Sequence, residues 1–276
     1  MTHHDPQPRP PQTLRLLSFN MQVGIGTKRY REYITRGWRN LLPSLQVQEN
    51  LGRIATLIAD YDIVGIQEAD AGSRRSSYQN QIEWLADRAG FAYWRVLVNR
   101  DLGHFAQHGV GLLSRHTPFA ISEHALPGAL PGRGALRALF GSRQEPLAVV
   151  VTHLALTRGS RRQQLAAVRA LIEDFPHALV MADTNCSPSR LRANPALADG
   201  RLCIVPQRLP TFPSWRPRRC LDHILTTAEL TVRDVHVPDV RLSDHRPVAM
   251  TVGLPPSLQQ RWAAACDPRD PSAAPW

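Results

Sequence analysis

Short apolar runs and helix-like repeats alternate along the chain. The run L-A-V-V-V-T at residues 147–152 is the clearest predicted strand, because β-branched side chains favour extended backbone. Between residues 45 and 58, apolar residues recur at helical spacing, which predicts one buried helix face. Helices are also predicted over residues 79–89, closed by Gly90, and over 160–174, with Ser160 as the N-cap. Further strands are predicted at residues 14–19, 62–67, 92–98, 109–114, 178–182, 222–226, 231–237 and 247–252.

This alternation is typical of an α/β domain, which we place at residues 13–254. Residues 1–12 and 255–276 are rich in proline and in small or polar residues, and we expect both to be disordered tails. Residues 115–145 contain several prolines and glycines and are expected to be loop-rich.

Polar side chains lie at the ends of most predicted strands. These polar residues are Asn20, Gln22, Gln67, Glu68, His153, Asp183, Asn185, Asp222, His223, Asp244 and His245. Each alone has an ordinary explanation, such as a surface carboxylate, an Asx turn or a buried histidine. Together they favour one site, because a rigid sheet fixes side chains that its end loops leave exposed.

The chemistry of this set is selective. Carboxylate and amide oxygens are hard ligands that suit Mg²⁺, Mn²⁺ or Ca²⁺, and they come from Glu68, Asp183, Asp244, Asn20 and Asn185. Histidines can donate hydrogen bonds to a phosphate or act as a general acid, and a carboxylate can hold the imidazole in its productive tautomer. His153, His245 and Asp222 fit those roles.

The sequence lacks the motifs of several other enzyme classes. The sequence contains no P-loop, no dinucleotide-binding fingerprint and no serine nucleophile elbow. The four cysteines form no C-x-x-C pair, which argues against a zinc ribbon and fits free thiols in a reducing compartment. The chain opens without a leader pattern, and no apolar run approaches the ~20 residues that span a bilayer, so we expect a cytoplasmic protein.

The order of these motifs resembles that of the endonuclease/exonuclease/phosphatase superfamily. The matching segments are S-F-N at 18–20, I-Q-E at 66–68, G-L-L-S-R at 111–115, V-T-H-L at 151–154, A-D-T-N at 182–185, L-D-H-I-L at 221–225 and S-D-H-R-P-V at 243–248. The resemblance implies a four-layer sandwich, with two mixed β-sheets face to face, helices outside and the active site at one rim.

The resemblance also implies a role for each site residue. Glu68 is the principal metal ligand, with Asn20 and Asp244 nearby. Asp183 orients or deprotonates the attacking water, and Asn185 positions that water or the phosphate. His245, supported by Asp222, contacts the scissile phosphate, while His153 contacts it from another side and is a candidate to protonate the leaving group.

The chain departs from the pattern of the abasic-site repair branch. Gln22 stands where that branch has an acid, Ala182 and Thr184 replace the usual glycine and aromatic residue, and D-Y-I is replaced by D-H-I at residues 222–224. These departures argue against a dedicated abasic-site enzyme.

Three segments are candidates for substrate recognition. Residues 28–43 interleave arginines with tyrosines and a tryptophan, which suits stacking on nucleobases, an anionic lipid surface or an ordinary cationic helix face. The glycine-rich stretch at 128–143 contributes Arg133, and the stretch at 211–219 contributes Trp215 and Arg216. The formal net charge of +10 favours a polyanionic partner or reflects only an arginine-rich surface.

We therefore expect a Mg²⁺- or Mn²⁺-dependent phosphodiesterase, with DNA or RNA as the favoured substrate. Two alternatives stay open. One is a sphingomyelinase-like phosphohydrolase acting on phospholipid head groups, or an enzyme acting on small phosphate esters. The other is a non-catalytic module that binds polyanions.

Overall fold

The computed structural model describes residues 11–24, 45–73, 76, 78–101, 107–129 and 131–265. The basic and aromatic segment at residues 28–43 lies outside these ranges, so its predicted role in recognition stays a prediction.

Two six-stranded sheets make up the body of the protein. The first has the order β11-β12-β1-β2-β4-β3 and consists of β1 (Thr13–Asn20), β2 (Ile63–Asp70), β3 (Tyr93–Asp101), β4 (Gln107–Ser114), β11 (Thr231–His236) and β12 (Val248–Gly253). The second has the order β5-β6-β7-β8-β10-β9 and consists of β5 (Ala120–Ala125), β6 (Gly134–Gly141), β7 (Pro146–His153), β8 (His177–Asp183), β9 (Leu202–Cys203) and β10 (Asp222–Thr227). Each sheet is mixed: β1 and β2 pair in parallel in the first, β7 and β8 in the second, and the other pairings are antiparallel.

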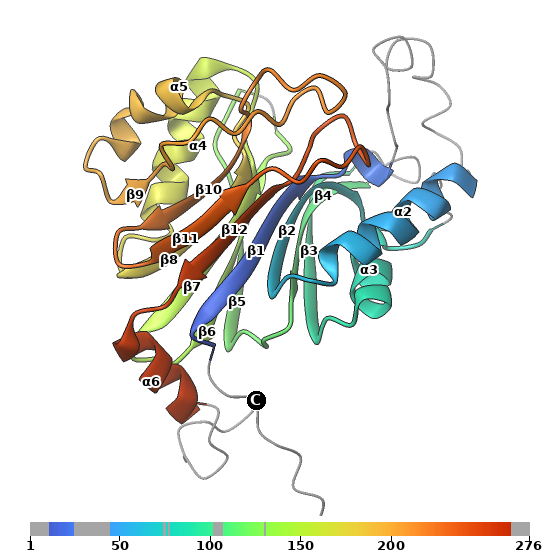
Figure 1. The fold of residues 1–276 in the computed structure, drawn as a ribbon. Coiled ribbons are helices and arrows are strands. Elements are labelled where there is room, and N and C mark those ends of the chain that lie inside the picture. The colour runs from blue at the N-terminus through green and yellow to red at the C-terminus, as the bar shows by residue number, and fades with distance from the viewer. Residues whose placement is uncertain are drawn as a thin grey trace, which may run out of the picture.

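Helices cover the outer faces of both sheets. Figure 1 shows α2 (Leu45–Ile58) and α3 (Gln81–Ala89) on one side, and α4 (Arg158–Ala170) and α5 (Pro188–Arg192) on the other. Short 3-10 turns follow β1 (η1, Gln22–Gly24) and α5 (η4, Pro195–Leu197). The predicted four-layer sandwich is confirmed. No helix among the described residues is long and apolar enough to cross a membrane.

Apolar side chains from the facing sheets fill the space between them. Leu16, Ile63, Val149, Val151 and Met181 belong to this central cluster and are fully buried. Gly65 of β2 marks a close approach of the sheets, because a Cβ there would lie 3.1 Å from Met181 Cβ. Separate apolar clusters lie between each sheet and its helices.

The two parallel pairs determine where the strand ends gather. Parallel neighbours end at the same edge, and the ladder pairs His153 at the end of β7 with Asp183 at the end of β8. The antiparallel strand β10 begins at that edge, where Asp222 pairs with Asp183. Polar residues from these strands therefore meet at one rim of the sandwich.

The prediction that residues 115–145 are loop-rich missed two strands. The strands β5 and β6 occupy much of that stretch and pair with each other and with β7. Glycines suggested loop, but Gly134 and Gly141 are the first and last residues of β6, and the interior of the strand is apolar and largely buried.

The prediction of a disordered tail from residue 255 is wrong for its first part. Residues Pro256–Ala265 form helix α6, which buries Leu258 and Trp262 against the central cluster. These two side chains lie four residues apart and so share one helix face. Residues 266–276 lie outside the described ranges.

The cap of α4 also differs from the prediction. The helix begins earlier, with Thr157 as its N-cap. The Ser160 side chain is buried inside the first turn, where its Oγ accepts a hydrogen bond from the backbone N–H of Ala129.

Candidate active site

The carboxylate of Asp183 lies at the centre of the polar rim. Asn20 Nδ2 donates a 3.0 Å hydrogen bond to Asp183 Oδ2. The same oxygen lies 3.4 Å from His153 Nε2 and 3.9 Å from His245 Nε2. Burial, followed by the negative charge of Asp222, raises the pKa of Asp183 despite the two imidazoles. A cation or a hydrogen-bond donor beside this carboxylate would therefore stabilise its ionised form.

A buried carboxylate holds His245. The Nδ1 atom of His245 lies 2.8 Å from Asp222 Oδ2, which also accepts a hydrogen bond from Thr211 Oγ1. Burial alone would lower the pKa of His245, but the charge and hydrogen bond of Asp222, together with Asp183 and Asp244, raise it to about 10. His245 is thus an imidazolium at neutral pH, with Nδ1 donating to Asp222 and Nε2–H on the side of Asp183.

His153, in contrast, is a neutral imidazole at neutral pH. Burial lowers its pKa to about 3, and Arg133, His245 and His108 add to that effect against the pull of Asp183. Its Nε2 lies 3.1 Å from Asn185 Nδ2, which also donates to the carbonyl of Leu154 at 2.9 Å. Since an amide nitrogen can only donate, Nε2 of His153 accepts and the ring proton sits on Nδ1.

Glu68 and Asp244 contribute the other two carboxylates of the rim. Asn20 Nδ2 donates to Glu68 Oε1 at 3.1 Å, and Ser243 Oγ donates to Asp244 Oδ1 at 3.1 Å. The pKa of Asp244 is raised to about 6, by burial first and then by the nearby charge of Glu68, although His245 acts against the shift. This repulsion between acids is the kind that a cation relieves.

Among the described residues, one group of side chains has metal-ligand spacing. One atom each from Asp183, Asp222 and His245 lies within 4.8 Å of the others. However, Asp222 Oδ2 already accepts from His245 and Thr211. We therefore interpret Asp222 and His245 as a hydrogen-bonded pair and assign the stronger cation-binding character to Glu68, Asp183 and Asp244.

Two residues of the rim have strained backbone. Glu68 has φ of +57° and Asn185 has φ of +52°, a left-handed conformation that non-glycine residues seldom adopt. At Glu68 the strain coincides with a register shift between β2 and β4, which turns this side chain out of the regular alternation. At Asn185 it coincides with a turn closed by the 2.9 Å hydrogen bond from Asn185 N to Asp183 Oδ1.

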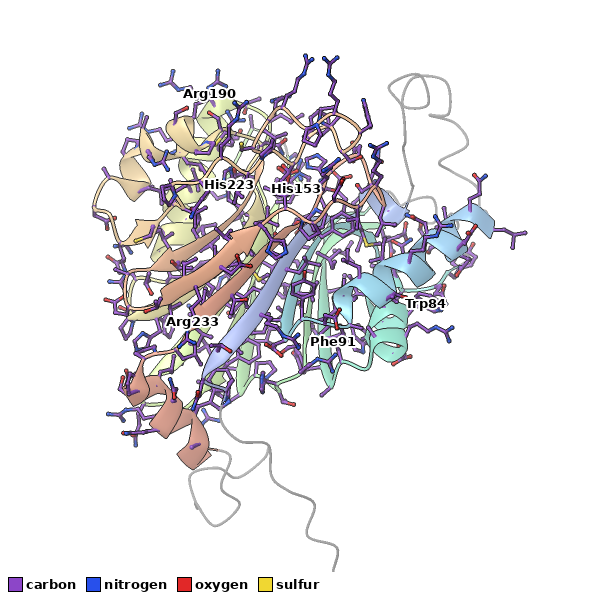
Figure 2. All side chains as sticks on the ribbon, in the orientation of Figure 1. Trp84, Phe91, His153, Arg190, His223 and Arg233 are labelled. Atoms are coloured by element: carbon purple, nitrogen blue, oxygen red, sulfur yellow. The ribbon has the colours of Figure 1, made fainter. Side chains whose placement is uncertain are left out.

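Two residues that differ from the pattern of the repair branch, Thr184 and His223, hold this turn in place. Thr184 Oγ1 donates to the carbonyl of Leu221 at 3.0 Å. His223 Nε2 lies 3.1 Å from the carbonyl of Cys186, so the ring donates there. Figure 2 shows His153 and His223 toward the same end of the molecule. Both substitutions thus fasten the loop that carries Asn185.

The predicted substrate-binding residues are Arg133, Trp215 and Arg216. Arg133 is near enough to lower the pKa of His153. Trp215 is half-buried and Arg216 is exposed. Their loop is fixed to the site because Ser214 N donates to the carbonyl of Asp244 at 2.7 Å.

The sequence did not single out three further contacts. Thr211 donates to Asp222, Ser243 donates to Asp244, and the Phe212 ring lies 4.8 Å from the His245 ring. Of these side chains, Ser243 had a local signal, because it is the first residue of the S-D-H-R-P-V segment. Thr211 is eleven residues from Asp222, and no spacing rule links them.

Comparisons with known proteins agree with this architecture. The profile of the Endonuclease/Exonuclease/phosphatase family matches residues 17–245. No curated protein matches the chain.

Several solved structures have a similar fold. An endonuclease/exonuclease/phosphatase from Beutenbergia cavernae DSM 12333 is 21% identical, with a TM-score of 0.69 over 88% of this chain and 72% of that one. A mannosyl-6-phosphatase from Bacteroides thetaiotaomicron VPI-5482 is 16% identical, with a TM-score of 0.65 over 87% and 99%. The human Nocturnin catalytic domain with bound sulfate is 18% identical, with a TM-score of 0.63 over 88% and 94%.

At these identities the structural likeness shows the fold, whereas the profile spans most of the chain and all the motifs from Ser18 to His245. Together with the sandwich and its rim, it establishes that the chain belongs to the endonuclease/exonuclease/phosphatase family.

Proposed function

We propose that the protein hydrolyses a phosphodiester by attack of water, with a bound divalent cation, Mg²⁺ or Mn²⁺, and that nucleic acid is the substrate. The observation that carries the proposal is that the two histidines of the rim differ in charge. His245 is held as a cation by Asp222, while His153 is neutral beside Asp183. A site of this kind can donate to a phosphate and accept a proton from water.

The donor set fits a divalent cation. Glu68, Asp183 and Asp244 supply oxygen ligands, and burial together with the charge of Glu68 raises the pKa of Asp244, which a nearby cation would counteract. Asn20 would complete the set. The cation supplies charge neutralisation at the phosphate.

The residues of the chain would share the remaining work. His245 donates Nε2–H to a phosphate oxygen, since Asp222 occupies its Nδ1. Asp183 accepts a proton from the attacking water. Asn185 holds the water or the phosphate. His153 is neutral, so its Nδ1–H can donate a hydrogen bond to the leaving group, which takes its proton from solvent water.

The charge around the rim favours a polyanion. Between residues 184 and 221 the chain has a single acid, Asp199, and arginines at 190, 192, 208, 216, 218 and 219, besides Arg201, which lies away from the rim and donates to the carbonyls of Ile172 and Phe175. Asp199 pairs with Arg169, so none of these arginines is neutralised by it through an ion pair. Figure 2 shows Arg190 at the end of the molecule where His153 lies. Such a cationic border attracts the phosphates of a nucleic-acid strand.

One observation favours a phospholipid instead. Leu156 follows His153 by three residues, and 75% of its surface is exposed. An exposed leucine among arginines suits a lipid surface as well. Small phosphate esters are a further alternative, and the mannosyl-6-phosphatase shares the fold.

The test is a substrate panel with the purified protein and Mg²⁺ or Mn²⁺. The panel contains single- and double-stranded DNA, RNA, phospholipid vesicles and a bis-aryl phosphodiester. We expect cleavage of nucleic acid, its loss in excess EDTA, and a fall of on the order of 10³-fold or more in D183A and H245A. The matched control is D199A, which removes an exposed acid. Activity on lipid alone would reject the substrate, and full activity of D183A or H245A would reject the mechanism.

A further inference from the structure

The turn that follows Asn20 contains two non-glycine residues with strained backbone, Gln22 and Val23, followed by a glycine with positive φ. Gln22, Val23 and Gly24 have φ of +46°, +57° and +77°. A β-branched residue such as Val23 is especially disfavoured in this left-handed region. Strain of this kind persists only where surrounding contacts hold it, and it is common at functional sites.

A buried amide from α3 holds the middle of the turn. Gln81, the first residue of α3, donates from Nε2 to the carbonyl of Val23 at 2.9 Å. Its Oε1 accepts from the backbone N–H of Asp70 at 2.9 Å. Asp70 follows Glu68 by two residues. One side chain therefore connects the Asn20 turn to the strand end that carries Glu68.

A second buried amide, from α2, holds the end of the turn. Asn50 Nδ2 donates to the carbonyl of Gly24 at 2.9 Å and to the carbonyl of Leu242 at 2.7 Å. Leu242 precedes Asp244 by two residues. Asn50 therefore connects the same turn to the loop that carries Asp244 and His245.

Both amides sit on a rigid support. Leu51 and Ile54 of α2 and Ile82 and Leu85 of α3 pack into one buried cluster with Phe19 of β1. Asn50 and Gln81 are the polar residues on these core-facing helix stripes, and both are buried. A buried polar group costs stability unless it is hydrogen-bonded, and here each forms two hydrogen bonds to separate loops.

We propose that Asn50 and Gln81 are positioning residues that set Asn20, Glu68 and Asp244 at the mutual spacing a divalent cation requires. We call the pair the amide brace. It acts through backbone carbonyls and an N–H and touches neither substrate nor cation. The inference rests on the proposed function, because that proposal assigns the cation to a set of residues that includes these three and Asp183.

The alternative is that the amide brace only stabilises the fold. The two roles differ in what a substitution changes. A stabilising role lowers the melting temperature and leaves cation affinity intact in the folded protein. A positioning role weakens cation binding while the protein is still folded, because outer groups that orient metal ligands affect affinity by about 10- to 100-fold.

The experiment uses the full-length chain with N50L and Q81M, which remove the hydrogen bonds at similar volume and add no charge. The matched control is Q48L, an exposed amide on the same helix as Asn50. Mn²⁺ binding is measured by calorimetry, unfolding by temperature, and hydrogen exchange at the amides of Met21 and Gly24. If N50L or Q81M does not fold, the near-isosteric N50D and Q81E replace them, since both lose the donor Nδ2 or Nε2.

We expect Mn²⁺ to bind about 10-fold or more weakly in both brace variants, with faster exchange at Met21 and Gly24, and wild-type behaviour in Q48L. Unchanged affinity in folded brace variants would overturn the proposal. If the wild-type protein bound no Mn²⁺, the proposed function would fail instead. The exchange rates would then still decide whether the amides hold the turn, and unchanged rates would overturn that as well.

Discussion

The Nδ1 atom of His245 lies 2.8 Å from Oδ2 of Asp222, and both side chains are buried. Asp222 opens β10 and pairs in register with Asp183, while His245 comes from the loop before β12. The two sheets thus each contribute one partner. The position of one sheet relative to the other consequently controls the charge of the imidazole, because the carboxylate of one sheet holds the proton of a residue in the other.

The first prediction concerns D222N. Asp222 keeps His245 protonated up to about pH 10, so in the wild-type enzyme activity that needs the imidazolium falls only as the pH rises toward that value. The amide carries no charge, and burial then lowers the pKa of His245. We expect activity at neutral pH to fall by on the order of 10³- to 10⁴-fold, as for loss of the carboxylate in a hydrolytic triad, and the alkaline limb to move to lower pH. The measurement is kcat/KM against pH.

An exposed pair provides the control for D222N. Asp234 Oδ2 lies 2.8 Å from His236 Nδ1, the same contact in solvent on β11. D234N should leave the pH profile unchanged. An alkaline limb at the wild-type position in D222N would show that Asp222 does not set the charge of His245.

The second prediction concerns Asp244 and the cation. The pKa of Asp244 is about 6 in the protein without a cation, well above that of an unfolded chain. The group therefore contributes stability below its unfolded pKa of about 4, and that stability is lost as the pH rises through about 6. We expect D244N to melt higher than wild type at pH 7 without a cation. Added Mg²⁺ should raise the melting temperature of wild type and have little effect on D244N.

The same residue predicts how cation binding depends on pH. Below about pH 6 a proton competes with the cation for Asp244, so the apparent affinity for Mg²⁺ should fall by up to about 10-fold per pH unit. Calorimetric titrations at pH 5, 6 and 7 would measure this. An affinity independent of pH over that range would place the cation away from Asp244.

The rim was predictable because strand ends in a parallel pair must meet. Glu68, His153 and Asp183 each follow a strongly apolar run, and the sheet pairings bring the last two side by side. The pairing of Asp222 with His245 was expected only from the family resemblance. The strand pattern does not predict it, because the packing of two sheets and not a ladder brings these side chains together.

The amide brace left a weaker signal in the sequence. Asn50 lies four residues before Ile54 and Gln81 four before Leu85, so each is a polar residue on an apolar helix stripe. That pattern indicates a buried polar group, but its partners, Leu242 and Val23, are set by tertiary structure. The loops held by such groups can be identified only once the helices are placed on the sheet.

The third prediction concerns Glu145, which lies just before β7 and joins three elements. Its side chain accepts from His177 Nε2 at 2.8 Å and from Ser257 Oγ at 3.0 Å, and Arg261 Nε lies 2.7 Å from Oε2. The hydrogen bond from His177 is the main cause that lowers the pKa of Glu145. Its stabilisation is therefore present above the unfolded pKa of about 4.3 and is lost as the pH falls through the lower, folded pKa.

We expect E145Q to lower the free energy of unfolding at pH 7 by about 1.5–3 kcal/mol, the range for a hydrogen bond to a charged group. The difference from wild type should shrink between pH 5 and pH 3. Activity should be retained, because His177 opens β8 at the end opposite to Asp183. Thermal melts across that pH range would test this, and a difference that persists at pH 3 would contradict it.

The last prediction tests whether α6 is part of the domain. Figure 1 shows this helix at the end of the sandwich away from the loops that carry the active site. Trp262 is buried, stacks on Phe140 with ring centroids 6.2 Å apart and meets the His116 ring edge-on at 5.3 Å. W262A leaves a large cavity against the central cluster, which typically costs about 3–5 kcal/mol. Q260A, an exposed substitution on the same helix, should change the unfolding midpoint in urea very little, whereas W262A should lower it strongly. Equal midpoints for the two variants would mean that α6 does not contribute to the stability of the fold.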